Sequence, residues 1–274
     1  MSIIVTDLTF QKEIQRLLKE SNKSLEEINA ELETSNHELQ QFASIASHDL
    51  QEPLRKILIF STMLRDKQQH ELSENSLSFL GKIIASSQRM RTMISDILSY
   101  SRLPGNTDEF EITNLAEVVT EVLDDYEILI SEKKATIIIG TLPEAEVNRG
   151  QIRQVFQNLI SNSLKFSRPD VPLMVEITSR ENPKIEVTPK KEGLVRTCSI
   201  EISDNGIGFD ELYSKKIFTL FQRLNTKDKY EGSGIGLAIA KKIMDRHNGT
   251  ISASGKEGHG ARFTITLPLR RSGR

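Results

Sequence analysis

The 274-residue sequence contains a single cysteine, Cys198, and almost no net charge. One cysteine cannot form an internal disulfide, which favours a reducing compartment. With 36 basic and 38 acidic residues, no excess charge favours binding to nucleic acid or an anionic membrane. No apolar run approaches the roughly 20 residues that span a bilayer, and the first residues do not form a signal peptide. We therefore expect a cytoplasmic protein that binds neither nucleic acid nor membrane.

A seven-residue repeat of apolar side chains occupies the N-terminal part of the chain. One column is Leu18, Leu25, Leu32, Leu39 and Ala46, and the other is Ile14, Ile28 and Phe42. This spacing is typical of the seam of a parallel coiled coil. Ser21 and Ser35 weaken the seam, as suits a coil that must shift. We predict a helix over about 11–64, in which residues 11–41 form a coiled-coil signalling helix.

The run Ile3-Ile4-Val5 precedes this helix and predicts a short strand, closed by Thr6-Asp7. It resembles the last strand and exit of PAS sensor domains. Residues 1–10 would then be the end of an upstream sensor domain, and a simple N-terminal arm is the alternative.

His48 lies in the same helical pattern, and Asp49 follows it directly. A carboxylate beside an exposed imidazole can hold one tautomer and stabilise the positive charge that grows on the ring during nucleophilic attack. Pro53 cannot donate the bond that the carbonyl of Asp49 would accept, so we expect a bend there. Such a pair is common on protein surfaces, and only the rest of the chain favours a catalytic role. We predict that His48 accepts a transferred group.

A second amphipathic pattern follows a polar stretch at residues 65–75 and ends before Pro104-Gly105. Its apolar side carries Leu77, Leu80, Ile84, Met90, Ile94 and Ile97. Two antiparallel helices do not enclose a core, but two copies of them do. We therefore predict that residues 42–103 form an all-α dimeric four-helix bundle that carries the histidine.

From residue 109 the pattern changes to mixed helices and strands, which indicates a second domain. We expect strands at 110–112, 135–140, 173–179, 197–203, 250–254 and 261–267, and helices at 115–132, 149–166 and 234–247. Residues 181–194 are rich in Lys, Glu, Pro and Gly, and a solvated hairpin extension is expected there.

Two motifs in this domain predict contacts with a nucleotide. Asn158, Asn162 and Lys165 share one face of a predicted helix, where amide oxygens can bind a hard cation and an ammonium can hold phosphate. Asp204 ends a strand, where its carboxylate can accept a hydrogen bond from the exocyclic amine of adenine. The following glycines, Gly206 and Gly208, let the backbone approach a ligand closely.

A second glycine motif, at residues 232–237, opens a predicted helix. Its Gly232, Gly234, Gly236 and Leu237 place free amides and the positive end of the helix dipole toward a phosphate chain. The motif lacks the preceding strand of a dinucleotide-binding fold, which we exclude. An apolar run before it ends in Arg223, and the polar residues 224–231 predict a lid over the phosphates.

In this order, the motifs resemble those of sensor histidine kinases over about residues 35–268. The stretch around His48 is similar to the phosphoacceptor box of phytochrome-like and PAS-linked members. The other boxes match Asn158, Asn162 and Lys165; Asp204, Gly206 and Gly208; Phe218, Phe221 and Arg223; and Gly232, Gly234 and Gly236. The resemblance implies a helical bundle followed by an α+β sandwich ATP-binding domain at 109–270, of the type shared with gyrases and chaperones.

The same resemblance implies ATP, Mg²⁺ and a homodimer that moves the γ-phosphoryl group to His48 and then to an aspartate on a response-regulator receiver domain. Asp49 would orient the ring and take its proton. Asn162, with Asn158, would bind Mg²⁺, while Lys165 and Arg223 would neutralise phosphate charge. Many members carry Thr or Asn four residues after the histidine, a position linked to placing the water that dephosphorylates the regulator. This chain has Glu52 there, which puts phosphatase activity by that route in doubt.

Two alternatives remain open. The first is an ATP hydrolase of the gyrase and chaperone group, whose members activate water with a Glu four residues before the metal-binding Asn. That position is Asn158 here, and an amide is no base at neutral pH. The second is a dimeric scaffold that binds nucleotide without transferring phosphate.

Overall fold

The computed structural model describes residues 2–68, 71–102, 109–182, 196–224 and 232–270. The chain divides into two compact units, residues 1–53 and 54–274, and each unit is described by itself. None of the described helices combines the length and apolar composition that a bilayer span needs.

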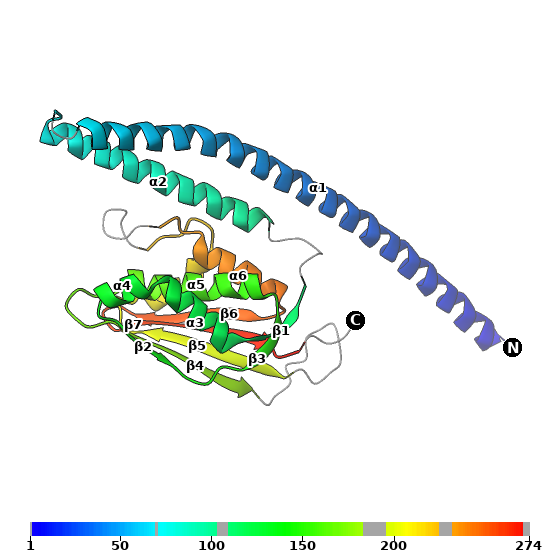
Figure 1. The fold of residues 1–274 in the computed structure, drawn as a ribbon. Coiled ribbons are helices and arrows are strands. Elements are labelled where there is room, and N and C mark those ends of the chain that lie inside the picture. Colours follow the sequence, from blue (N-terminus) through cyan, green and yellow to red (C-terminus); the bar gives the residue numbers. More distant parts are fainter. Residues whose placement is uncertain (1, 69–70, 103–108, 183–195, 225–231, 271–274) are drawn as a thin grey trace. The chain divides into compact units, whose positions relative to one another are not determined.

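Helix α1 runs without interruption over Ser2–Gln68 and includes Pro53 (Figure 1). The predicted long helix is therefore confirmed. In the single chain, Leu18 and Leu25 of the seam are each 56% exposed, and Ile28 is 58% exposed. A helix with such a seam gains stability when a second apolar surface covers it.

The strand predicted at residues 3–5 is wrong, because these residues belong to α1. A lone strand has no neighbour for its backbone hydrogen bonds, whereas each helical bond is made within the helix. The β-branched residues are therefore drawn into the helix that follows them. The assignment of 1–10 to a sensor domain stays a prediction.

Helix α2, Glu74–Arg102, completes the expected helical hairpin with the end of α1. Ser73 starts α2, because its hydroxyl accepts a hydrogen bond from the backbone N–H of Ser76 at 3.2 Å. Leu80 and Ile94 are buried, whereas Phe60 and Phe79 are 67% and 63% exposed. The hairpin therefore keeps apolar surface outside its own contact, as the predicted bundle of two copies requires.

The α/β domain, which starts at residue 109, has two layers, as expected (Figure 1). Its sheet contains β2 (Thr136–Ile139), β4 (Met174–Asn182), β5 (Thr197–Asp204), β7 (Gly260–Pro268) and β6 (Thr250–Lys256), in that spatial order. The β2–β4 pair is parallel and the other pairs are antiparallel. Strands β1 (Glu111–Asn114) and β3 (Glu144–Val147) form a separate antiparallel pair.

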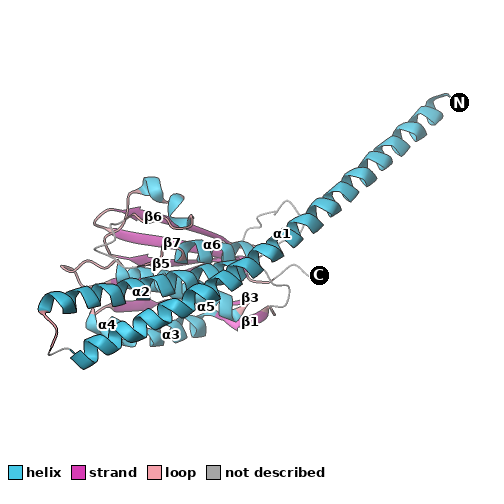
Figure 2. Cartoon of the chain, turned by 90° about the horizontal axis from the view of Figure 1, so that it is seen from above, coloured by secondary structure: helices cyan, strands magenta, loops and turns pink. Residues whose placement is uncertain are grey.

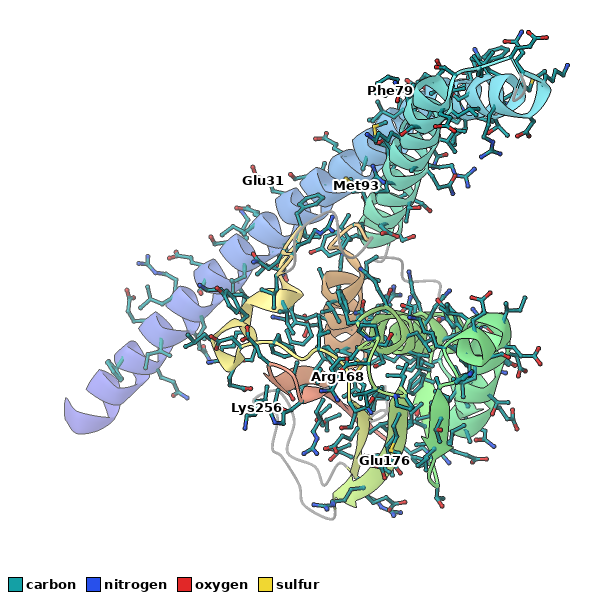
Figure 3. All side chains as sticks on the ribbon, turned by 90° about the vertical axis from the view of Figure 1, so that its left-hand side faces the viewer. Glu31, Phe79, Met93, Arg168, Glu176 and Lys256 are labelled. Atoms are coloured by element: carbon teal, nitrogen blue, oxygen red, sulfur yellow. The ribbon has the colours of Figure 1, made fainter. Side chains whose placement is uncertain are left out.

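Helices lie over one face of the sheet (Figure 1 and Figure 2), and the core lies on that face. Helices α3 (Leu115–Asp125), α5 (Arg149–Lys165) and α6 (Gly236–Arg246) contribute fully buried side chains to it. Phe156 and Ile160 of α5 pack in the same cluster as Ile177 and Ile200 of the sheet. The opposite face is polar: Arg262 pairs with Glu201 at 3.0 Å there, and Glu176 is exposed (Figure 3).

Two details differ from the sequence prediction, and a third prediction lies outside the described residues. The helix expected over 115–132 is two helices, α3 and α4 (Glu127–Glu132), because Tyr126 leaves helical geometry at φ −109° and ψ 11°. Strand β3 was not predicted. The proposed hairpin extension falls mainly on residues 183–195, outside the described residues, although β4 and β5 that flank it do pair antiparallel.

The start of α5 is tied to the end of α6, which fixes the two helices that carry the candidate site. Asn148 caps α5, because its side chain accepts a hydrogen bond from the N–H of Gln151 at 2.9 Å. The backbone N–H of Asn148 donates to Nε2 of the buried His247 at 3.1 Å, and His247 ends α6.

Candidate nucleotide and phosphoacceptor sites

A cavity of about 490 Å³ opens between α5, α6 and the ends of β5 and β7. The predicted residues that line it are Asn158, Asn162, Lys165, Asp204, Gly208, Arg223, Gly232, Gly234, Gly236 and Leu237. Four separate motifs, up to 79 residues apart between Asn158 and Leu237, therefore meet around one space. Gly206, Phe218 and Phe221 do not line it.

Asp204 provides a buried carboxylate in the cavity wall. Its Oδ1 accepts hydrogen bonds from the N–H of Gly206 at 2.9 Å and of Ala261 at 3.2 Å, and its Oδ2 accepts one from the hydroxyl of Ser163 at 2.9 Å. Burial raises the pKa of Asp204, and these three hydrogen bonds act in the opposite direction. Gly206 thus does not line the cavity itself, but its N–H holds the Asp204 carboxylate that does.

The glycine motif at 232–237 leaves space for side chains of α5. A Cβ on Gly232 would lie 2.4 Å from Nζ of Lys165, and one on Gly236 would lie 2.9 Å from Oδ1 of Asn158. Gly234 has φ +74°, which other residues rarely adopt. The loop therefore holds the amide of Asn158 and the ammonium of Lys165 beside its own backbone, an arrangement that suits a phosphate chain.

The cavity also fits a magnesium ion that arrives with a phosphate ligand. Among the described residues no group of three or more His, Cys, Asp or Glu side chains could hold a metal by itself. Mg²⁺ commonly takes one or two protein oxygens and completes its shell with water and phosphate. Asn162 and Asn158 offer amide oxygens in the wall, and Nδ2 of Asn158 is buried without a partner in the described structure.

The segment with the two phenylalanines supports the cavity without lining it. Phe218 is buried in the core, while Phe221 is 55% exposed with φ +61°. Arg223 follows them into the cavity wall. The predicted lid falls mostly on residues 225–231, outside the described residues.

Two side chains at the cavity were not identified from the sequence. Ser163 follows Asn162 in α5, and its hydroxyl contacts Asp204. Asp96 of α2 lines the cavity and accepts a hydrogen bond from the hydroxyl of Ser233 at 2.5 Å. Burial raises the pKa of Asp96, and the bond from Ser233 lowers it. Ser163 occupies a position that the asparagine motif does not specify, and Asp96 lies outside the motifs. Contacts 41 and 137 residues apart leave no local signal.

His48 and Asp49 lie on α1 in the first unit, with side chains that are 81% and 72% exposed. Nδ1 of His48 is 3.2 Å from Oδ1 of Asp49. If Nδ1 carries the proton, it donates to this carboxylate and leaves the Nε2 lone pair directed to solvent. The pair therefore has the geometry of an accessible nitrogen nucleophile held by an acid.

The chain thus has two parts: helices that include an exposed histidine on α1, and an α/β domain with a cavity lined by glycines, amides and cations. Family models match both parts. Residues 38–106 match the His Kinase A phosphoacceptor domain. Residues 147–271 match the histidine kinase-, DNA gyrase B- and HSP90-like ATPase domain.

The chain is 35% identical over 231 residues to the phytochrome-like protein Cph1 of Synechocystis, covering 84% of this chain and 29% of that protein. It is 30% identical over 237 residues to the sensor protein kinase WalK of Staphylococcus epidermidis, covering 84% and 36%. The structure of histidine kinase ThkA in complex with response regulator TrrA has a similar fold, with TM-score 0.56 and 21% identity over 85% of this chain and 64% of that one.

The chain contains the two domains of a sensor histidine kinase catalytic core. It spans about a third of the length of these two curated relatives, Cph1 and WalK.

Proposed function

We propose that the chain is an ATP-dependent protein-histidine kinase that transfers the γ-phosphoryl group of ATP to His48. The observation that carries this proposal is the single cavity in which Asp204, Lys165 and Arg223 meet a glycine-rich loop, in a chain that also presents an exposed His48. A buried carboxylate suits the adenine amine, and the cations suit the phosphates at the other end of the same ligand.

In the proposed reaction, Nε2 of His48 attacks the γ-phosphorus of ATP. An N–P bond forms, the bond from the γ-phosphorus to the bridging oxygen breaks, and ADP leaves. The imidazole becomes positively charged during attack, and the Asp49 carboxylate stabilises this charge or takes the Nδ1 proton. Lys165 and Arg223 would neutralise phosphate charge, which is the main protein contribution to phosphoryl transfer.

A bound Mg²⁺ would neutralise further charge on the phosphate oxygens. Asn162 is its proposed protein ligand, with Asn158 in support. Oδ1 of Asn158 occupies the space that a Cβ on Gly236 would need, so Asn158 lies against the start of α6 whether or not it binds the ion.

The wider organisation is also part of this proposal. Residues 11–41 would form a coiled coil, 42–103 the dimerisation and phosphoacceptor domain, and 109–270 the ATP-binding domain, in a cytoplasmic homodimer. The exposed apolar residues of α1 and α2 support the dimer. An upstream sensor domain would supply the signal, and an aspartate of a response-regulator receiver domain would accept the phosphoryl group.

The hydrolase alternative is not favoured, because the position of the expected general base is Asn158. The scaffold alternative has no specific support either, since the residues expected to bind phosphate line one cavity.

The test is incubation of the full chain with ATP labelled in the γ-phosphoryl group. We expect label that is lost in acid and stable in alkali, as a phosphorus–nitrogen bond to imidazole requires. His48→Ala should abolish the label, and the matched control His259→Ala, an exposed histidine elsewhere, should retain it. Equal labelling of His48→Ala and wild type would contradict the proposal.

A further inference from the structure

Ser163 does not line the cavity, but its hydroxyl contacts a residue that does. It lies in the last turns of α5, is 1% exposed, and faces the end of β5. A serine inside a helix commonly donates its hydroxyl to the carbonyl one turn back. Here that carbonyl, of Leu159, is 3.4 Å away, whereas Oδ2 of Asp204 is 2.9 Å away. The shorter contact goes to a carboxylate, and such charge-assisted hydrogen bonds are the stronger ones.

The three hydrogen bonds give the two carboxylate oxygens of Asp204 different partners. Oδ1 accepts from two backbone N–H groups, of Gly206 and Ala261, and Oδ2 accepts from Ser163. An ionised carboxylate oxygen has two lone-pair directions. With Ser163 at one of them, Oδ2 can offer the other to a donor in the cavity that Asp204 lines.

Ser163 also limits the rotation of this group. The terminal torsion of an aspartate is broad and roughly two-fold, so packing alone does not fix the carboxylate plane. Donors on both oxygens fix it, and Ser163 supplies the side-chain donor on Oδ2.

We propose that Ser163 is a positioning residue that sets the preference of the cavity for purines with a 6-amino group. The proposal rests on the proposed function, in which Asp204 binds the exocyclic amine of adenine. Through the hydroxyl of Ser163, Oδ2 of Asp204 is aimed at that amine. The residue touches no substrate atom and acts only through Asp204.

The experiment compares two ligands on the same protein sample: ATP, and purine riboside triphosphate, which lacks the 6-amino group. Their dissociation constants are measured for wild type, Ser163→Ala, Ser163→Cys and the control Ser199→Ala. Ser199 also bonds a side chain, Thr266, at 3.0 Å, but on the open face of the sheet. Ser163→Ala removes the hydrogen bond from the Ser163 hydroxyl to the Asp204 carboxylate. It should therefore weaken ATP binding by about fivefold to tenfold.

Binding of the analogue should change by less than about twofold in Ser163→Ala, because the analogue has no amine for Oδ2 to accept from. The dissociation constant of the analogue divided by that of ATP should therefore fall toward one in Ser163→Ala. Ser199→Ala should keep the wild-type ratio. Ser163→Cys has a similar side-chain size and a weak S–H donor, so it should give an intermediate ratio. It provides the same comparison if Ser163→Ala does not fold.

Equal weakening of both ligands would overturn the inference, because it would show a general structural role for Ser163. An unchanged affinity for ATP would overturn it as well. Failure of the proposed function looks different: the wild-type chain would then bind no ATP or place no label on His48.

Discussion

The key polar groups of the two parts of this chain differ in how far they are exposed and how firmly they are held. His48 is 81% exposed, and its hydrogen bond to Asp49 is made within the same helix. Asp204 is held at both oxygens by α5, the β5–β7 region and the turn after β5. Under the proposed function, His48 meets two different partners and gains from accessibility, whereas the cavity holds one ligand and gains from fixed geometry. The comparison therefore assigns positioning to the α/β domain and access to the helices.

The same contrast holds for the apolar residues. Phe156 is fully buried in the core of the α/β domain, and Phe60 on α1 is 67% exposed in the single chain. Phe156→Ala should destabilise the domain by about 3–5 kcal/mol, because it leaves a cavity. Phe60→Ala should leave the unfolding of that domain unchanged and weaken self-association. Denaturant unfolding and sedimentation measure the two effects, and equal loss of domain stability in both variants would break the comparison.

Asn162→Ala should reduce phosphorylation of His48 at least about a hundredfold, because electrostatic stabilisation of the transferred group is lost. The dimer should persist, since Asn162 lies in the α/β domain. Labelling with ATP and sedimentation test both statements. Arg153→Gln, on the same helix but outside the cavity lining, is the control. Wild-type labelling of Asn162→Ala would remove the metal role from this residue.

The buried Asp204 should also make the stability of the α/β domain depend on pH. Burial raises its folded-state pKa, so the folded state binds more protons than the unfolded one between the two pKa values. Stability should then fall as pH rises from the ordinary pKa of aspartate through the raised value. Asp204→Asn should flatten this dependence, leaving the contribution of Asp96, whose pKa is raised as well. Thermal unfolding against pH tests this, and an unchanged slope in Asp204→Asn would contradict it.

The open face of the sheet should give the smallest effect. Glu201 and Arg262 pair at 3.0 Å there, with side chains that stay partly exposed to water. Glu201→Gln should cost less than about 1 kcal/mol, because solvent screens such pairs. Its ATP binding should match wild type. A larger loss by denaturant unfolding would mean that this face is more than a solvated surface.

Much of the architecture could be predicted because its signals are local. The heptad of Leu18 and Leu25 repeats along one helix, and the spacing of Asn158 and Asn162 places both on one face of α5. The errors arise where distant contacts decide. Residues 3–5 have strand propensity but no neighbouring strand, so they join α1. Likewise, Ser163 became identifiable only when the fold placed β5 beside it.

The central claim is that the γ-phosphoryl group of ATP bound in the cavity is transferred to Nε2 of His48. Mass spectrometry of the intact chain and its peptides after incubation with Mg-ATP, kept at neutral or alkaline pH, locates the phosphoryl group directly. We expect it on His48, in a peptide that remains unmodified in Asn162→Ala. A phosphoryl group on another residue, or release of inorganic phosphate with His48 unmodified throughout, would contradict the account.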